Sequence, residues 1–380
     1  MSTRERDLRL DFGRGAALII IFIDHVPDNP LSNWTLRNFA FCDAAEIFVI
    51  ISGMASYLAY GSLLDRGSFR ECIRAVARRW LQVYQAHLLL FCAVAAFVLV
   101  ASRYFSGADY MDSLKLNWLV QDPVRAIVSA VTLSYLPRLL DILPLYLILL
   151  GIAPATLYLV KLDYRLALFA SGLVYSLTWL NGWNLPAGAS RDWYLNPFAW
   201  QLLYTIGMVV SHVRRAASGG LRQRRSWLFA AIGFAAFAAV IAGPLNARGL
   251  TEIAPLRYLW PAEKTFLSPL RVINVLALVY VFGFFVSPQA PWLKTKFANL
   301  FLACGRHSLP VYGSGVVLSI VGCVVITESA SKAMANWMVN LLGIVVLLSL
   351  AVMLDWSSQR WRLAFVSAAF RWNTSNFRGD

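Results

Sequence analysis

Long apolar segments, separated by short polar breaks, run along almost the whole chain. Examples are LLLFCAVAAFVLVA, LPLYLILLGIAPATLYLV and LLGIVVLLSLAVML. Each approaches the roughly 20 apolar residues that cross a bilayer as a helix. Hydrophobic residues make up 59% of the 380 residues and charged residues only 14%, whereas a soluble domain has roughly a quarter of its residues charged. The sequence therefore predicts an all-α, polytopic integral membrane protein and not a barrel.

About ten membrane-spanning helices are predicted from the positions of these segments. We place them near residues 11–27, 40–60, 80–103, 141–160, 164–181, 197–212, 227–243, 269–287, 300–324 and 336–355. The basic residues behind the net charge of +14 fall mostly in alternate loops, which argues against nucleic acid as a partner. Because cytoplasmic loops retain Lys and Arg, both termini are predicted to be cytoplasmic. Residues 122–138 are too short and too polar for a full crossing and are predicted to form a surface or re-entrant helix on the outer side.

A single membrane-embedded domain is predicted over residues 1–380, with a short basic cytoplasmic tail at about 357–380. The first apolar segment has no small-residue cleavage pattern, so we expect a retained span and not a removed signal peptide. The expected location is the bacterial inner membrane, with lipid as a partner, and the sequence leaves a homodimer open. The histidines and cysteines lack ligand spacing, so no metal site is expected.

Charged side chains within the first two predicted spans are candidate functional groups, because a charge in the hydrocarbon costs roughly 3 kcal/mol. Asp11, Arg14 and His25 lie on one stripe of the first helix, with Arg14 and His25 about 16 Å apart along its axis. Asp43 and Glu46 form a similar stripe in the second span. Since the connecting loop is short, we expect the two spans to be adjacent and antiparallel, which brings these acids to the depth of His25.

The pair Asp24-His25 is a candidate site for acid–base chemistry. A carboxylate from Asp24 or Glu46 can fix the tautomer of His25 and raise its basicity, as a general base for a hydroxyl nucleophile requires. Proton-coupled transporters use the same residue types, so a transporter or flippase stays open, as does a structural scaffold. The absence of paired internal repeats in the sequence argues against the transporter.

Other polar side chains at the ends of predicted spans could line the same cavity. Arg74, Arg78 and Arg79 begin the third span and suit phosphate binding, although ordinary basic flanking of a cytoplasmic loop explains them equally well. Outer loops 182–196 and 244–268 are rich in Trp and Tyr, which is typical of an interfacial belt, with stacking on sugar rings as the alternative. The remaining candidates on the inner side are Tyr84 and His87 of the third predicted span, with Arg306 and His307 near the inner start of the ninth. Those on the outer side are Asp43, Asn196, Trp200, Gln201, Arg271 and Asn274.

The segment LDFGRGAALIIIFIDH at residues 10–25 resembles the first-span signature of the acyltransferase-3 superfamily. In that signature an Arg-Gly pair is followed, eleven residues after the Arg, by a histidine, and Arg14 and His25 match this spacing. EIFVIISG at 46–53 resembles the second-span signature, with Glu46 where many members have Asp. The basic start of the third span, RAVARRWLQVY, is also similar.

A narrower resemblance covers nearly the whole chain. The order and spacing of Asp24-His25, DAAEIFVIISG, Tyr84 with His87, LPLY at 143–146, NPFAWQLLY at 196–204 and GRHSLPVY at 305–312 resemble the OpgC family, which succinylates osmoregulated periplasmic glucans. The resemblance implies an acyl-CoA donor, a periplasmic glucan acceptor and His25 as the central catalytic residue. Succinyl-CoA is the expected co-substrate, with acetyl transfer left open.

The resemblance also implies a path for the reaction. The phosphates of the donor are expected at the arginines of the third span, with the pantetheine arm passing Arg14 to reach His25. His25 then deprotonates a sugar hydroxyl that arrives from the outer side, and a covalent acyl-histidine stays open as a variant. A succinyl carboxylate would need a cation, for which Arg271 or Arg306 is expected.

Overall fold

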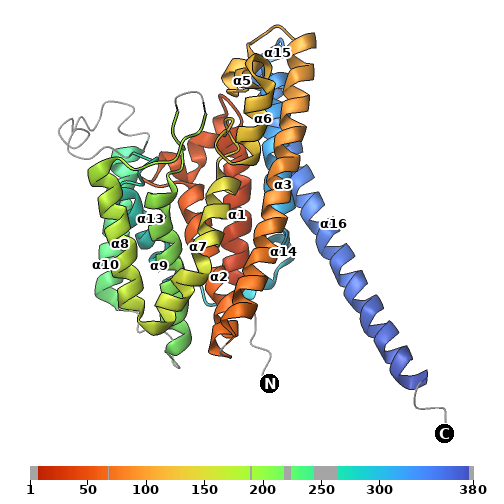
Figure 1. The fold of residues 1–380 in the computed structure, drawn as a ribbon. Helices are drawn as coiled ribbons and strands as arrows, with labels where there is room; N and C mark the ends of the chain where they lie inside the picture. Colours follow the sequence, from red (N-terminus) through yellow and green to blue (C-terminus); the bar gives the residue numbers. More distant parts are fainter. Residues whose placement is uncertain (1–6, 67, 189–190, 218–223, 244–262, 376–380) are drawn as a thin grey trace.

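The computed structural model describes residues 7–375 apart from 67, 189–190, 218–223 and 244–262. These residues contain fourteen α-helices, three short 3₁₀ helices and one isolated β-bridge between Pro186 and Asp192. Most of the longer helices stand side by side in one bundle, and the C-terminal part of the longest helix extends away from it (Figure 1). The predicted all-α class is confirmed.

The bundle is built from helices whose bounds follow the apolar segments. They are α1 (Leu8–His25), α2 (Ala44–Asp65), α3 (Phe69–Tyr104), α7 (Ile142–Leu162), α8 (Tyr164–Asn181), α9 (Pro197–Ala216), α10 (Arg225–Ala242), α13 (Pro269–Phe285), α14 (Lys296–Arg306), α15 (Ser308–Glu328) and α16 (Lys332–Ser375). Short elements join them, namely η1 (Pro30–Trp34), η2 (Leu36–Asn38), α4 (Tyr110–Ser113), α5 (Asn117–Gln121), α6 (Pro123–Val131) and η3 (Pro291–Lys294).

Six of the described helices are long and apolar enough to cross a membrane: α2, α3, α7, α10, α15 and the first part of α16. The chain is therefore a multi-pass membrane protein. Each of the ten predicted ranges overlaps a helix, but the number of crossings and their orientation stay predictions. α1 begins and α16 ends at the same end of the bundle (Figure 1).

Several boundaries differ from those expected. α3 begins at Phe69, because Ser68 accepts a hydrogen bond from the Glu71 amide and caps the helix. It then runs for 36 residues. The ninth range is two helices that meet at His307, since Pro310 has no amide proton to continue the ladder across this point. Residues 122–138 hold only the nine-residue helix α6, and α16 continues as a helix through most of the predicted tail.

Glycines allow two pairs of helices to cross at backbone contact. A Cβ added at Gly53 of α2 would lie 2.0 Å from the carbonyl oxygen of Tyr204 in α9, and one at Gly207 would lie 2.2 Å from that of Ile50. The same close approach joins α1 to α14, where a Cβ at Gly305 would lie 1.9 Å from the Asp11 oxygen. Small residues allow such packing where helices cannot rely on water to drive them together.

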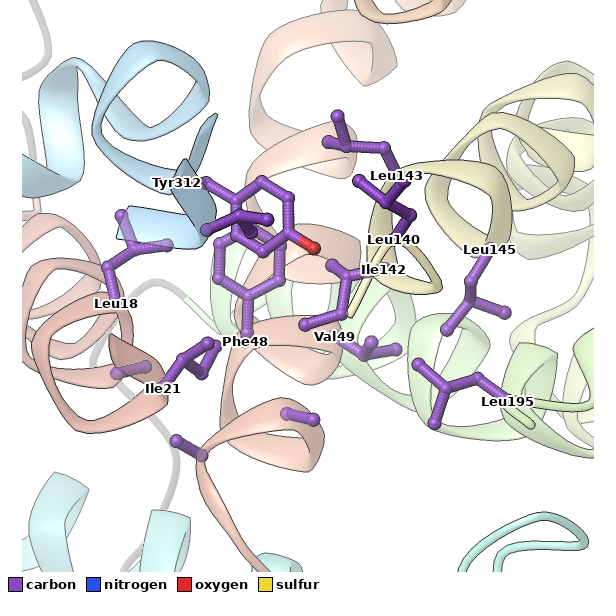
Figure 2. Packing of buried hydrophobic residues seen from close by; sticks show 14 of the residues in the cluster. Leu18, Ile21, Phe48, Val49, Leu140, Ile142, Leu143, Leu145, Leu195 and Tyr312 are labelled. Atoms are coloured by element: carbon purple, nitrogen blue, oxygen red, sulfur yellow. The ribbon is translucent and has the colours of Figure 1, made fainter. Parts of the chain in front are cut away.

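Apolar side chains from the crossing helices form one continuous core. Figure 2 shows part of it, with Leu18 and Ile21 of α1 near Phe48 of α2 and Tyr312 of α15. The antiparallel neighbours α1 and α2 pack against each other, as the short connecting loop predicts. This packing fixes the end of α1, where His25 lies.

We expect Gly53→Ala to destabilise the bundle, because the added methyl group would overlap the α9 backbone. The free energy of unfolding in mixed micelles should fall by about 1–3 kcal/mol, as for other overpacked cores. Gly151→Ala in α7 is the matched control, since its Cβ would meet no atom within 4 Å. Equal stability of the two variants would contradict the close crossing of α2 and α9.

Candidate active site

Two cavities meet at the end of the bundle where α1 terminates. Their volumes are about 710 and 690 Å³, within the range of small-molecule sites. The residues common to both linings are Asp24, His25, Arg37, Arg138 and Leu139. His25 therefore lies at the junction of the two spaces, with a carboxylate and two guanidinium groups beside it.

The first cavity is bounded by the segment that follows His25 and by one face of α15. Buried asparagines fix that segment to α16: Asn336 donates to the carbonyl oxygens of Pro27 and Asp28 at 3.1 and 3.0 Å. Asn29 and Asn340 exchange hydrogen bonds of 2.7 and 2.9 Å. The chain leaving His25 is thereby held in place by a helix distant in sequence.

The second cavity is lined by both charged and apolar side chains. Ile21, Ile142 and Leu195 line it and also belong to the core (Figure 2). The exposed ring of Tyr194, from the loop at 182–196 that is predicted to lie on the outer side, forms part of its wall. The charged lining consists of Asp24, Asp43, Asp141 and Asp192 with Arg37, Lys115, Arg138, Arg191, Lys264 and Arg271.

Asp24 and His25 form the last two residues of α1 and are both half-buried. The Asp24 carboxylate accepts a hydrogen bond of 2.6 Å from the Thr35 hydroxyl, and its carbonyl oxygen accepts one of 3.3 Å from Arg37. The η1 and η2 segment thus fixes the acid next to His25. The structure places both side chains where a ligand in either cavity can reach them.

Asp43 and Glu46 lie at the start of α2 and form a capping box. Asp43 caps the helix, and the Glu46 carboxylate accepts a hydrogen bond of 2.9 Å from the Asp43 amide. The other Glu46 oxygen lies 2.6 Å from Arg271 Nη1, and Asp43 lies 2.5 Å from Lys264 Nζ. These two hydrogen bonds occupy the Glu46 carboxylate, so its contribution to His25 is indirect, through the position of α2.

The loop residue Lys264 stays charged within this cluster. Burial disfavours its ammonium group, but the carboxylates of Asp43 and Glu46 outweigh that cost and raise the pKa of Lys264 above its ordinary value. Arg271 also lies 3.8 Å from Asp43, so two acids and two cations form one ionic network. The network joins α2, α13 and the loop before α13 at the wall of the second cavity.

Four residues that were predicted to line the outer side of the cavity are instead buried, and they contact the segments that form its wall. Trp200 donates to the carbonyl oxygens of Lys264 and Thr265 at 3.1 and 3.2 Å, which positions the Lys264 backbone. Asn274 accepts hydrogen bonds from the amides of residues 41 and 42, directly before Asp43. Asn196 caps α9, and Gln201 pairs with Ser171 of α8.

At the other end of α1, several predicted donor residues gather around the break between α14 and α15. Arg306 Nη1 lies 3.0 Å from Asp355 Oδ2, and His307 Nε2 lies 3.4 Å from the other oxygen of that carboxylate. Gly305 contacts the Asp11 backbone, one turn before Arg14. Arg306, like Arg271, is thus paired with an acid of the protein itself.

The predicted residues of α3 are separate from both cavities described above. Arg74 and Arg78 are exposed near its first turns, and Arg79 is half-buried. Tyr84 donates a hydrogen bond of 2.8 Å to the Val131 carbonyl oxygen, at the end of α6. His87 is fully buried, and neither ring nitrogen has a hydrogen-bond partner among the described residues.

Sequence reasoning missed several residues that line the site, above all Arg138, Asp141 and Lys264. They come from loops or helix ends, where no periodic pattern marks them. One local signal was available: the tetrapeptide DAAE at 43–46 before an apolar run is the pattern of a capping box. This pattern places both acids at the N-terminal end of α2 and not in the middle of the helix.

Removing Arg271 should destabilise the protein strongly, because Glu46 is fully buried and would lose its cation. We expect Arg271→Leu to cost about 3–5 kcal/mol of unfolding free energy in mixed micelles. The double variant Glu46→Leu with Arg271→Leu should recover much of that loss, since no unpaired charge remains. Arg125→Leu, at an exposed arginine of α6, is the control. A stable Arg271→Leu protein would refute the role of this ion pair.

Comparison with known proteins finds one family model that matches the part of the chain forming the site. The family model described as OpgC protein matches residues 6–359 and so includes both cavities and the ionic network. No curated protein and no solved structure matches the chain. The family match spans nearly the full length and agrees with the resemblance in the motifs of the first, second and ninth predicted spans. The chain belongs to the OpgC protein family.

Proposed function

We propose that this protein transfers a succinyl group from succinyl-CoA to hydroxyl groups of a periplasmic glucan, across the bacterial inner membrane. Membership of the OpgC family implies a role in glucan succinylation. The observation that carries the finer proposal is the position of His25 at the junction of two cavities. A base at such a junction can contact an acceptor in one space and a donor in the other.

The second cavity suits the glucan. Its acids and cations can bond to sugar hydroxyls, and the exposed Tyr194 offers an aromatic face for a sugar ring. Fixed charges also keep this space hydrated, so an acceptor arriving from water needs little desolvation. The ionic network of Asp43, Glu46, Lys264 and Arg271 makes its wall rigid, which limits the positions that a bound sugar can take.

His25 acts as the general base in this proposal. A ring nitrogen takes the proton of the sugar hydroxyl while the oxygen forms a bond to the thioester carbonyl carbon. The tetrahedral intermediate then collapses and breaks the carbon–sulfur bond. The imidazolium returns its proton to the departing thiolate, so an ester and free CoA leave an unchanged enzyme. Asp24 is the nearest acid in sequence to support the charged imidazolium, and Thr35 fixes its orientation.

Donor binding is proposed at the opposite end of the bundle. The exposed guanidinium groups of Arg74 and Arg78 can bind phosphates of CoA, with Arg79 beside them. Arg14 lies about 16 Å along α1 from His25, on the same stripe, and would guide the extended arm of the donor. Arg306 and His307 lie at the helix break, directly after Gly305, which packs against the Asp11 backbone of α1.

His25→Ala should abolish transfer from succinyl-CoA to a purified glucan, because the hydroxyl would lose its base. We expect a fall of at least about 100-fold in rate, with an unchanged thermal unfolding midpoint. Transfer is measured by mass spectrometry of the glucan, which also gives the mass of each added group. Substantial activity of the variant would exclude the catalytic role, and an unmodified glucan with the wild-type protein would favour a transporter.

Arg78→Gln combined with Arg79→Gln should weaken binding of the donor and leave chemistry intact. We expect KM for succinyl-CoA to rise about 10-fold with little change in kcat, since phosphate contacts stabilise ground state and transition state alike. Arg125→Gln serves as an exposed arginine control. An unchanged KM would remove this cluster from the donor site.

A further inference from the structure

Arg138 and Arg37 are the two cations that line both cavities at His25, and Arg37 donates a hydrogen bond of 3.3 Å to the Asp24 carbonyl oxygen. Arg138 differs from the other cations of the site. Lys264 and Arg271 are paired with Asp43 and Glu46, and Lys115 lies 3.5 Å from Asp112. Within the part of the chain that the structure describes, Arg138 forms no ion pair, although its side chain is exposed to both cavities. Its guanidinium group is therefore available for an anion that a ligand brings.

The backbone around Arg138 is held in an unusual conformation. Leu139 has a φ of 73° and Leu133 a φ of 60°, both in the left-handed region that is unfavourable for a leucine. Two hydrogen bonds maintain this shape. The Arg138 amide donates to the Leu114 carbonyl oxygen at 3.0 Å. The Tyr312 hydroxyl donates to the Leu139 carbonyl oxygen at 3.2 Å. Strain that is held in this way is concentrated at functional sites.

We infer that Arg138 binds the free carboxylate of the acyl group while His25 serves the thioester end, and so selects a dicarboxylic over a monocarboxylic donor. This inference rests on the proposed function. A succinyl group carries its carboxylate two methylene groups from the reacting carbonyl, so the binding cation must lie beside the base. Arg138 meets this requirement, because it lines both cavities at His25.

The arginines expected from the sequence fit this role less well. Arg271 holds the buried carboxylate of Glu46, and Arg306 holds Asp355. A substrate carboxylate would have to displace an acid of the protein at either position. Arg191 also lines the second cavity, but it is absent from the lining of the first and so does not border the junction.

The test compares two donors of similar length, succinyl-CoA and the uncharged butyryl-CoA, in glucan acylation by the full-length protein. We expect Arg138→Gln to lower kcat/KM for succinyl-CoA by about 10- to 100-fold, the loss of a charge-assisted hydrogen bond. The value for butyryl-CoA should fall much less, so the preference for succinyl over butyryl should drop. Arg138→Lys should keep part of the preference for succinyl, because it retains the charge.

Arg125→Gln is the matched control, since Arg125 is exposed on α6 and lines neither cavity. Equal losses with both donors in Arg138→Gln, or an unchanged ratio between them, would overturn the assignment while leaving the proposed function intact. A changed ratio in Arg191→Gln but not in Arg138→Gln would move the role to Arg191. A wild-type protein that acylates no glucan from either donor would overturn the proposed function and this inference together.

Discussion

The fully buried carboxylate of Glu46 must be compensated, and the structure around the site is arranged to do so. Leaving a charge unpaired in a low-dielectric bundle costs several kcal/mol, whereas a bonded and paired charge can be held there. Arg271 supplies the cation from α13, Asp43 supplies an amide, and Lys264 balances the second acid. Two segments far apart in sequence, the start of α2 and the stretch from Lys264 to Arg271, are thereby joined at one end of the bundle.

Close helix crossings fix the position of the helix that carries His25. The glycines of α2 and α9 bring two backbones into contact, and those of α1 and α14 do the same. α1 in turn packs against α2 and ends at His25, where the asparagines of α16 fix the departing chain. Backbone contacts therefore position the end of α1 that carries the imidazole. This arrangement is consistent with a base that must stay accessible to substrates.

The sequence predicted the class of fold because hydropathy reports directly on the environment of each helix. It also indicated His25, Asp24 and Asp43 as one group, since two short-linked spans must be antiparallel neighbours. It could not indicate Arg138 or Lys264, because loops have no periodicity and their approach to the site depends on contacts such as those of Tyr312 and Trp200. The sequence also predicted that the cavity would be lined by Asn196, Gln201 and Asn274, but the structure places these residues behind its wall. Their polarity indicated burial with partners but not the identity of those partners.

His25 lies at the junction of two cavities, at the end of the bundle that we propose to face the outer side. Cysteine accessibility can test this position, in a His25→Cys variant whose native cysteines are replaced, including Cys323 of the first cavity. A charged thiol reagent that cannot cross the membrane should modify this cysteine from the outer side of intact cells. Added glucan should slow the reaction. Absence of modification from outside, with rapid modification in inverted vesicles, would contradict the account.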